Sequence, residues 1–422
     1  MLILYEFFLI IYLICYLPIL FIKGKWHSGF LERFGFFSEA IKERINHPKN
    51  IWIHAVSVGE VIAIAELIRR LKAKYPDCQI VLSTSTKTGH QLALEKLSDK
   101  VVILWSPLDF QWAVSAFIRL IKPKVYIVAE TELWPNLFAG LHAQSVPILL
   151  INGRISDNSY GRYLAIRWFM KRYLGYVSVL CMQSELDVKR ILAMGAPQDK
   201  VKNIGNVKFD DLPEDKTYLL EDFGFEHNDS LWIAGSTHPG EEDIVLRVFE
   251  NIRKKFPSLR LVIAPRHVER VLDVQRIVEE RGMVPVRFSQ MKSERRIPNS
   301  VVIVDTIGHL RALYSLATLV FVGKSLTVQG GHNIIEPAYF SKPVIVGPHM
   351  QNFRDVMIAF KNDKAVVEVK DSQEFESTVD RLLSHPAEMA ELGKKARQVI
   401  ARQQGAAARS VEIISRFLGK VL

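Results

Sequence analysis

The sequence of 422 residues has few cysteines: Cys15, Cys78 and Cys181 lie far apart, and no C-x-x-C pair occurs. This pattern disfavours a disulfide scaffold or a zinc knuckle and favours a reducing compartment such as the cytosol. Glycine (23 residues) and proline (18 residues) are near background, which excludes collagen-like and low-complexity chains. Hydrophobic residues make up 49% of the chain, enough to build cores, so disorder is excluded. At ~100–200 residues per domain, the length predicts two or three domains.

Several functional signatures are also missing. The chain contains neither the zinc motif H-E-x-x-H nor the phosphate-binding motif G-x-x-x-x-G-K-[ST], and no G-x-G-x-x-G follows a first strand. Zinc hydrolysis, phosphorylation by ATP and dinucleotide redox chemistry are therefore disfavoured. The net charge of +10 favours an anionic partner, but no helix-turn-helix, RNP or finger pattern points to nucleic acid. A phospholipid surface or a charged substrate fits better.

One long apolar run is present, at residues 2–22 (LILYEFFLIIYLICYLPILFI), close to the ~20 residues that a helix needs to cross ~30 Å of hydrocarbon. Its one charged residue, Glu6, lies near the end that can reach the interface, and no A-x-A-like cleavage site follows. By the positive-inside rule, the globular part is kept in the cytoplasm by the basic residues that follow, which are Lys23, Lys25, Arg33, Lys42, Arg44 and Lys49. We predict a single uncleaved membrane anchor over residues 1–22. The alternative is a hydrophobic helix that docks on the body or lies along the bilayer.

The rest of the chain alternates short apolar runs with amphipathic stretches, which predicts parallel sheets covered by helices on both faces. The predicted strands form two series: 51–56, 80–83, 101–105, 125–129, 148–151 and 179–182, then 231–234, 261–264, 301–304, 319–322, 344–346 and 365–369. We predict an α/β fold with two doubly wound, Rossmann-like domains facing a cleft. The predicted parts are an N-terminal domain (23–206), a polar linker (207–229), a second domain (230–385) and a helical tail (386–422), whose residues 411–418 pack back across the cleft.

Ligands of open α/β sheets bind beyond the carboxyl ends of the strands. Glu60 follows the first predicted strand in the segment S-V-G-E, where Gly59 permits a tight turn. It would lie in the first turn of a helix, whose dipole favours the ionised carboxylate that a general base requires. Glu60 could equally be half of a capping arrangement.

A second acidic element, Glu130 and Glu132, follows strand 125–129. Two carboxylates in this spacing could hold a divalent metal or a donor sugar, or brace the site. They could also be helix-start acids, with Pro135 at an early helical position. Basic residues complete the region: Arg154 follows the strand at 148–151, and Lys208 lies where the first domain ends.

Residues 162–176 (RYLAIRWFMKRYLGY) place four basic residues among aromatic ones without an acid. This pattern fits a helix that binds lipid phosphates or an anionic acceptor. A half-buried helix with a solvated face fits equally well.

Small-residue loops follow four strands of the second series: 235–242 (GSTHPGEE), 265–267 (PRH), 305–308 (DTIG) and 330–337 (GGHNIIEP). Backbone N–H groups at a helix start such as 235–242 can cradle a phosphate, and glycines let the backbone approach an anion. Glu336, one turn into a helix, could accept hydrogen bonds from ribose hydroxyls. The four loops together predict a nucleotide site.

The chain resembles the 3-deoxy-D-manno-octulosonic acid (Kdo) transferases of Gram-negative lipopolysaccharide synthesis over nearly its full length. The resemblance rests on WIHAVSVGE (52–60), STSTKTGHQ (83–91), AETELWPNL (129–137), INGRIS (151–156), GSTHPGEE (235–242), APRH (264–267), GGHNIIEPA (330–338) and VIVGPHMQNFRD (344–355). It implies an inverting GT-B glycosyltransferase on the cytoplasmic face of the cell inner membrane. Such an enzyme moves Kdo from CMP-Kdo onto the lipid A precursor and needs no metal or other cofactor.

The resemblance also implies roles for single residues. Glu60 would be the base that deprotonates the 6′-hydroxyl of the acceptor glucosamine, while Glu130 and Lys208 would stabilise the transition state. The implied CMP-binding residues are Pro265, Arg266, Thr306, Ile307, Gly308, Asn333, Ile334, Ile335 and Glu336. Lys324 departs from the glycine expected in a V-G-G-S-L segment, and Val328 and Gln329 depart from the usual residues before GGHN. Two alternatives remain, a UDP-sugar 2-epimerase of the same fold and a non-catalytic, membrane-tethered binder of nucleotide sugars or glycolipids.

Overall fold

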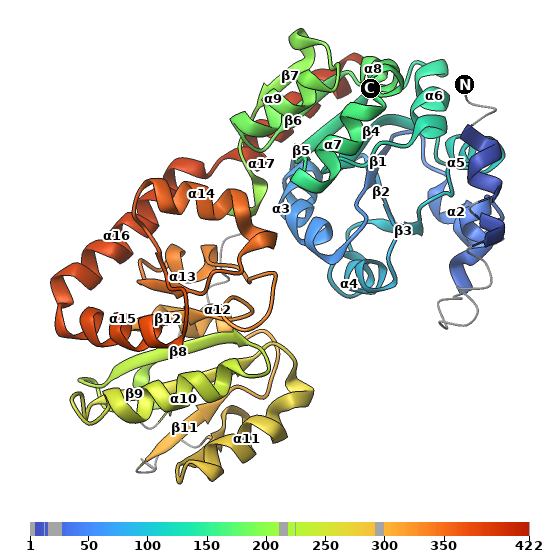
Figure 1. Cartoon of the computed structure of the whole chain (residues 1–422). Coiled ribbons are helices and arrows are strands. Elements are labelled where there is room, and N and C mark those ends of the chain that lie inside the picture. Colours follow the sequence, from blue (N-terminus) through green and yellow to red (C-terminus); the bar gives the residue numbers. More distant parts are fainter. Residues whose placement is uncertain are drawn as a thin grey trace. The chain divides into compact units, whose positions relative to one another are not determined.

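The computed structural model describes residues 5–11, 13–15, 28–210, 218–223, 225–291 and 299–421 (Figure 1). The chain divides into two compact units, Met1–Asp211 with Gln404–Leu422, and Leu212–Gln403. Each unit has a seven-stranded sheet whose neighbouring strands pair in parallel. The predicted α/β class with two parallel sheets is confirmed.

The sheet of the first unit has the strand order β3-β2-β1-β4-β5-β6-β7. Its strands are β1 (Asn50–His54), β2 (Gln79–Thr84), β3 (Val102–Trp105), β4 (Pro123–Ala129), β5 (Ile148–Gly153), β6 (Val179–Met182) and β7 (Val201–Asn203). Along β1, Trp52 packs in one core while Ile51 and Ile53 pack in the other, because successive side chains of a strand point to opposite faces. The strand order reverses between β1 and β4, and this is the switch point where doubly wound sheets bind ligands.

Helices cover both faces of this sheet. One face packs against α2 (Glu39–Ile45), α5 (Gln111–Ile121), α6 (Pro135–Ala143), α8 (Arg167–Tyr176) and α9 (Glu185–Ala193). The other packs against α3 (Val58–Lys74), α4 (Lys87–Leu97) and α17 (Ala406–Val421). The predicted helix over 162–176 is broken at Ile166, so that α7 (Asp157–Ala165) ends just before it and α8 begins just after it.

Most of the predicted anchor lies outside the described residues, which include 5–11 and 13–15 of it. Within the described part of the chain, no helix has both the length and the apolar character needed to cross a bilayer. The described residues 5–11 and 13–15 are helical.

The start of this N-terminal helix docks on the body of the first unit. Glu6 Oε1 accepts hydrogen bonds from Gln111 N at 2.7 Å and from Asn136 Nδ2 at 3.3 Å. Tyr5 Oη donates to Asp109 Oδ2 at 3.0 Å. These donors hold the Glu6 carboxylate against the body of the first unit.

The sheet of the second unit has the strand order β10-β11-β9-β8-β12-β13-β14. Its strands are β8 (Ser230–Thr237), β9 (Leu259–Pro265), β10 (Val284–Arg287), β11 (Ser300–Ile303), β12 (Leu319–Val322), β13 (Val344–Val346) and β14 (Val367–Glu368). The helices are α10 (Glu241–Ile252), α11 (Val271–Glu280), α12 (Leu310–Leu313), α13 (Ile335–Tyr339), α14 (Arg354–Asn362), α15 (Ser372–Ser384) and α16 (Pro386–Gln403). Trp232 and Phe321, on the adjacent strands β8 and β12, pack with Phe375 of α15 in its core.

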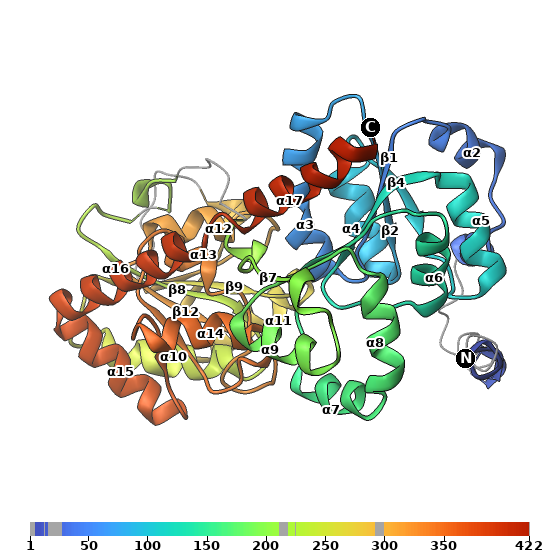
Figure 2. The same ribbon diagram turned by 90° about the horizontal axis from the view of Figure 1, so that it is seen from above.

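The C-terminal residues form two helices that belong to different units. Helix α16 packs on α13 and α15 of the second unit, whereas α17 packs on α3 of the first, beside which it lies in Figure 2. The carboxylate of Asp210 accepts hydrogen bonds from Gly405 N at 2.5 Å and Ala407 N at 2.6 Å. A carboxylate at a helix N-terminus complements its dipole, so Asp210 fixes the start of α17.

Candidate active site

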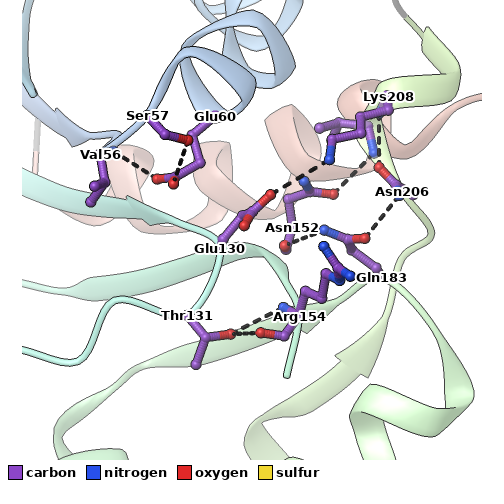
Figure 3. A network of polar contacts seen from close by, with 11 residues as sticks. Val56, Ser57, Glu60, Glu130, Thr131, Asn152, Arg154, Gln183, Asn206 and Lys208 are labelled. Atoms are coloured by element: carbon purple, nitrogen blue, oxygen red, sulfur yellow. Dashed lines mark hydrogen bonds and ion pairs between the residues drawn. The ribbon is translucent and has the colours of Figure 1, made fainter. Parts of the chain in front are cut away.

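Glu60 lies in the first turn of α3, directly beyond the carboxyl end of β1, and is only 6% exposed. Its Oε2 accepts a hydrogen bond from Val56 N at 2.7 Å, and its Oε1 accepts one from Ser57 Oγ at 3.0 Å (Figure 3). The capping arrangement considered for this residue is therefore present, and it fixes the carboxylate in one orientation. The tight turn predicted at Gly59 is wrong, because this residue already lies within α3.

The pKa of the Glu60 carboxyl is raised to about 7, chiefly by burial and then by the negative charge of Glu130. The two hydrogen bonds to the carboxylate oppose this shift. The helix dipole was expected to favour the ionised carboxylate of Glu60, but the loss of hydration and the charge of Glu130 outweigh the favourable local groups and raise its pKa. A carboxyl group with a pKa near 7 exchanges protons easily at neutral pH, which suits a general base.

Glu130 and Lys208 lie beside Glu60 in this unit. Glu130 directly follows β4, the strand next to β1, and its backbone is left-handed (φ 56°). Such a conformation costs ~1–2 kcal/mol in a residue other than glycine, so the fold must hold it there. Lys208 lies on the short 3-10 helix η4 (Val207–Asp210), and its Nζ is 3.8 Å from Glu130 Oε1. The structure therefore brings together all three residues to which catalytic roles were assigned.

A buried amide network supports the segment that contains Lys208 (Figure 3). The carbonyl of Asn152 accepts a hydrogen bond from Gln183 Nε2 at 2.8 Å, and Gln183 Oε1 accepts one from Asn206 Nδ2 at 2.8 Å. Asn206 Oδ1 in turn accepts from Lys208 N at 3.0 Å, and Asn152 Oδ1 accepts from Val207 N at 3.1 Å. This network was not predicted from the sequence. The residue in the sequence that could have indicated this network is Asn152, because asparagine is enriched at positive φ and Asn152 has φ 57°.

A pocket of about 170 Å³ opens next to Glu130 in the same unit. It is lined by Glu130, Thr131, Glu132, Arg154, Ser156, Ser159 and Tyr163. Burial, and then the charge of Glu130, raise the pKa of Glu132 to about 7. Carboxylates and hydroxyls can bind sugar hydroxyls, and an arginine can bind an anionic substituent.

Pro135 is the first residue of α6, as predicted.

In the described ranges of the chain, no group of three or more His, Cys, Asp or Glu side chains is placed so as to hold a metal ion.

The predicted CMP-binding residues of the second unit follow neighbouring strands of its sheet. Pro265 ends β9, and Arg266, whose N donates to Thr237 O at 3.0 Å, has an exposed side chain. Thr306, Ile307 and Gly308 follow β11, with Ile307 84% exposed. Because β11, β9, β8 and β12 are neighbouring parallel strands, their carboxyl ends lie side by side. The loops that follow them therefore lie along this one edge of the sheet.

The remaining predicted CMP-binding residues surround the start of α13. Glu336 Oε1 accepts a hydrogen bond from Asn333 Nδ2 at 3.2 Å and lies 3.4 Å from Arg311 Nε. Ile334 and Ile335 are buried. These two residues therefore offer a ligand only their backbone groups.

In the segment 235–242, which is predicted to cradle a phosphate, an acidic side chain binds backbone amides. The buried Glu241 carboxylate accepts hydrogen bonds from His238 N at 2.9 Å and from three amides of the loop after β12, those of Lys324, Ser325 and Leu326, at 2.8 to 3.0 Å. An acid in the first turn of α10 thus occupies one amide of this segment, that of His238, and three amides of the loop after β12. Glu241 thereby clamps two loops at the edge of the sheet where the predicted CMP-binding residues lie.

Two histidines of this edge were missed by the sequence analysis. His238 and His332 face each other with 3.1 Å between their Nε2 atoms, and the His267 ring lies 5.7 Å from that of His238. Burial, followed by nearby cations, lowers the pKa of His238 to about 4 and of His332 to about 3. Both rings are therefore neutral at pH 7. His238 lies in the motif GSTH and His332 in the motif GGHN. Because 94 residues separate them, the sequence did not indicate that they meet.

Known proteins resemble this chain in both of its units. A family model described as 3-deoxy-D-manno-octulosonic-acid transferase (kdotransferase) matches residues 28–211, and one for group 1 glycosyl transferases matches residues 242–399. A 3-deoxy-D-manno-octulosonic acid transferase of Haemophilus influenzae is 32% identical over 414 residues, which cover 96% of this chain and 95% of the relative. A protein of the same description from Rickettsia felis is 30% identical over 376 residues, covering 87% and 79%.

Solved structures support the fold. UDP-GlcNAc 2-epimerase from Neisseria meningitidis superposes with a TM-score of 0.59 and covers 88% of this chain and 100% of its own, at 14% identity. This superposition supports the predicted GT-B-like fold of two α/β units. At 14% identity it does not support an epimerase activity. The resemblance inferred from the motifs is confirmed by the Haemophilus relative. The chain belongs to the 3-deoxy-D-manno-octulosonic acid transferase family and is a glycosyltransferase.

Proposed function

We propose that this chain transfers Kdo from CMP-Kdo to the 6′-hydroxyl of the lipid A precursor lipid IVA, in lipopolysaccharide biosynthesis. The observation that supports this most is Glu60, a buried carboxyl group with a pKa of about 7 at the switch point of the first sheet. The names of the Haemophilus and Rickettsia relatives support Kdo as the transferred sugar.

In the proposed reaction, the Glu60 carboxylate accepts the proton of the acceptor hydroxyl as its oxygen attacks the anomeric carbon of Kdo. The bond from that carbon to the phosphate oxygen of CMP breaks, and CMP leaves with the bonding electron pair. Attack opposite to the leaving group inverts the configuration. Lys208 places a positive charge next to Glu130, where it can stabilise negative charge on the sugar acid. No protein–sugar bond forms in this scheme.

The pocket beside Glu130 is the proposed binding site for the acceptor sugar. Glu132, Ser156 and Tyr163 supply groups that bind hydroxyls, and Arg154 supplies a guanidinium for a phosphate on the acceptor. Orienting the hydroxyl next to Glu60 matters greatly, since well-oriented encounters supply ~7–11 kcal/mol of a barrier.

The test of this proposal is incubation of the full chain with CMP-Kdo and tetra-acylated lipid A precursor, followed by mass spectrometry of the lipid. We expect a gain of one or more Kdo masses, and the gain counts the sugars added. The same gain in EDTA is expected, because the proposed reaction uses no metal. An unchanged lipid mass would contradict the proposal and is the outcome expected of an epimerase or a non-catalytic binder.

We also propose that the chain acts on the cytoplasmic face of the inner membrane, held there by the N-terminal segment 1–22 and by α7 and α8. In the described part of the N-terminal helix, Phe7, Phe8 and Ile14 are more than half exposed, and on α8 Trp168 is 67% exposed. The two elements are neighbours, since the rings of Tyr5 and Phe169 lie 6.3 Å apart. Exposed cations accompany Trp168 on α7 and α8, namely Arg162, Arg167, Lys171 and Arg172.

A Trp168→Glu variant is expected to bind vesicles of phosphatidylethanolamine and phosphatidylglycerol about tenfold more weakly than the unchanged chain. Tryptophan sits favourably at the headgroup level, and glutamate is repelled by anionic lipid. The measurement is co-sedimentation at fixed salt, with Leu272→Glu as control, because Leu272 is 63% exposed in the second unit. Equal losses in both variants, or none in Trp168→Glu, would exclude α8 from the membrane surface.

A further inference from the structure

Lys324 occupies a position that favours glycine. It follows β12 and has a left-handed backbone with φ 55°, a conformation that costs ~1–2 kcal/mol in residues with a side chain. Glycine, which the resemblance predicts at this position, adopts it freely. A lysine in such a place therefore needs a reason beyond backbone geometry.

The side chain of Lys324 is held in a defined place. A Cβ atom at Gly330 would lie 2.9 Å from Lys324 Cε and 3.4 Å from Cδ, so the lysine stem runs over this glycine. The loop between them is closed by a hydrogen bond of 2.6 Å from Gly331 N to Lys324 O. Glu241 fixes the other side of the residue through Lys324 N. The stem is thus ordered before any ligand binds.

The Lys324 ammonium acts together with another cation on two histidine rings, and the carboxylate near Lys324, that of Glu241, is bound by loop amides. After burial, Lys324 is the largest cause that lowers the pKa of His238, and it also lowers that of His332, so its charge acts on both rings. Arg266 contributes to the same field, whereas Arg270 is paired with the buried Glu242 at 2.6 Å. Among the described residues, no acidic side chain forms an ion pair with the Lys324 ammonium. Two cations next to a pair of neutral imidazoles make a site suited to an anion.

We propose that Lys324 Nζ binds the phosphate of the donor nucleotide, as an additional ligand built into this chain at a backbone position suited to glycine. His238 and His332 complete the phosphate site as neutral hydrogen-bonding groups. The inference rests on the proposed function, since it takes the donor to be a cytidine nucleotide.

The test compares calorimetric affinities for CMP and for cytidine, which lacks the phosphate. In Lys324→Gly, we expect the Kd for CMP to rise about tenfold, which is about 1.4 kcal/mol, while the Kd for cytidine stays unchanged. Lys324→Gln, which keeps most of the stem but loses the charge, is expected to show the same selective loss. The melting temperature of Lys324→Gly is expected to stay level or to rise by up to ~4 °C, because glycine relieves the left-handed backbone.

Lys364→Gly is the matched control. Lys364 has a left-handed backbone too (φ 51°), is exposed, and precedes β14, at the opposite edge of the same sheet. This variant is expected to gain similar stability and to bind CMP like the unchanged chain. Unchanged CMP affinity in Lys324→Gly, or an equal loss for CMP and cytidine, overturns the proposal. These titrations contain no acceptor, so they test the Lys324 proposal separately from the transfer reaction. If the unchanged chain binds CMP but adds no Kdo to lipid, only the proposed reaction is refuted.

Discussion

Replacing Glu60 with Gln is expected to lower kcat for Kdo transfer by about 10²–10⁴-fold, the usual contribution of general-base catalysis. Glutamine has nearly the same shape: its Oε1 can accept the hydrogen bond from Val56 N, and its Nε2 can donate one to Ser57 Oγ. It cannot accept the proton of the acceptor hydroxyl. Because the pKa of Glu60 is raised by burial, removing its charge is not expected to unfold the chain. The rate is measured by mass spectrometry of the lipid product under saturating CMP-Kdo.

The matched control is Glu66→Gln on the same helix, where Glu66 pairs with Arg69 and Arg70 away from the site. This variant is expected to transfer Kdo like the unchanged chain. CMP affinity is expected to be unaltered in both variants, because the predicted CMP-binding residues all belong to the second unit. Near-normal product formation by Glu60→Gln would overturn the proposed mechanism.

The second large effect is expected from Lys208→Met, which removes the ammonium 3.8 Å from Glu130 Oε1. Removing a preorganised charge that stabilises a transition state typically costs about 10²–10³-fold in kcat. The ion pair itself is partly exposed and stabilises the fold little, so the loss is expected in kcat rather than in the melting temperature. Lys202→Met on β7, an exposed lysine of the same unit, is the control. A kcat within twofold of the unchanged value would remove Lys208 from the reaction.

The parallel sheets could be predicted from the sequence because their central strands are buried on both faces. Strand β12 and residues 125–129 of β4 are continuous apolar runs, and the segments predicted for them overlap the observed strands. The edge strands β7 and β10 were missed, because β7 contains the exposed Lys202 and Asn203 and β10 has no buried residue. Both strands lie at a sheet edge and pair on one side only, and both lack the fully apolar sequence of the central strands.

The neighbourhood of Glu60 and Glu130 could be predicted as well, since both follow strands that meet at one switch point. The electrostatic state of Glu60 could not, because it depends on the burial of a single carboxyl group. The histidine pair and the Glu241 clamp depend on contacts between segments more than 80 residues apart. The composition of the loop 235–242 also does not reveal that Glu241 binds amides of a second loop.

The dependence of kcat/KM on pH tests most directly whether Glu60 is the base. A carboxyl group accepts a proton only when ionised, and the Glu60 pKa of about 7 means that it is mostly protonated below neutral pH. The rate is therefore expected to rise about tenfold per pH unit up to about pH 7 and to level off above it. Glu130→Gln, which removes a charge that raises this pKa, is expected to move the rise to lower pH. A rate already level from pH 5 upward, as an ordinary glutamate with a pKa of ~4.3 would give, would contradict the account.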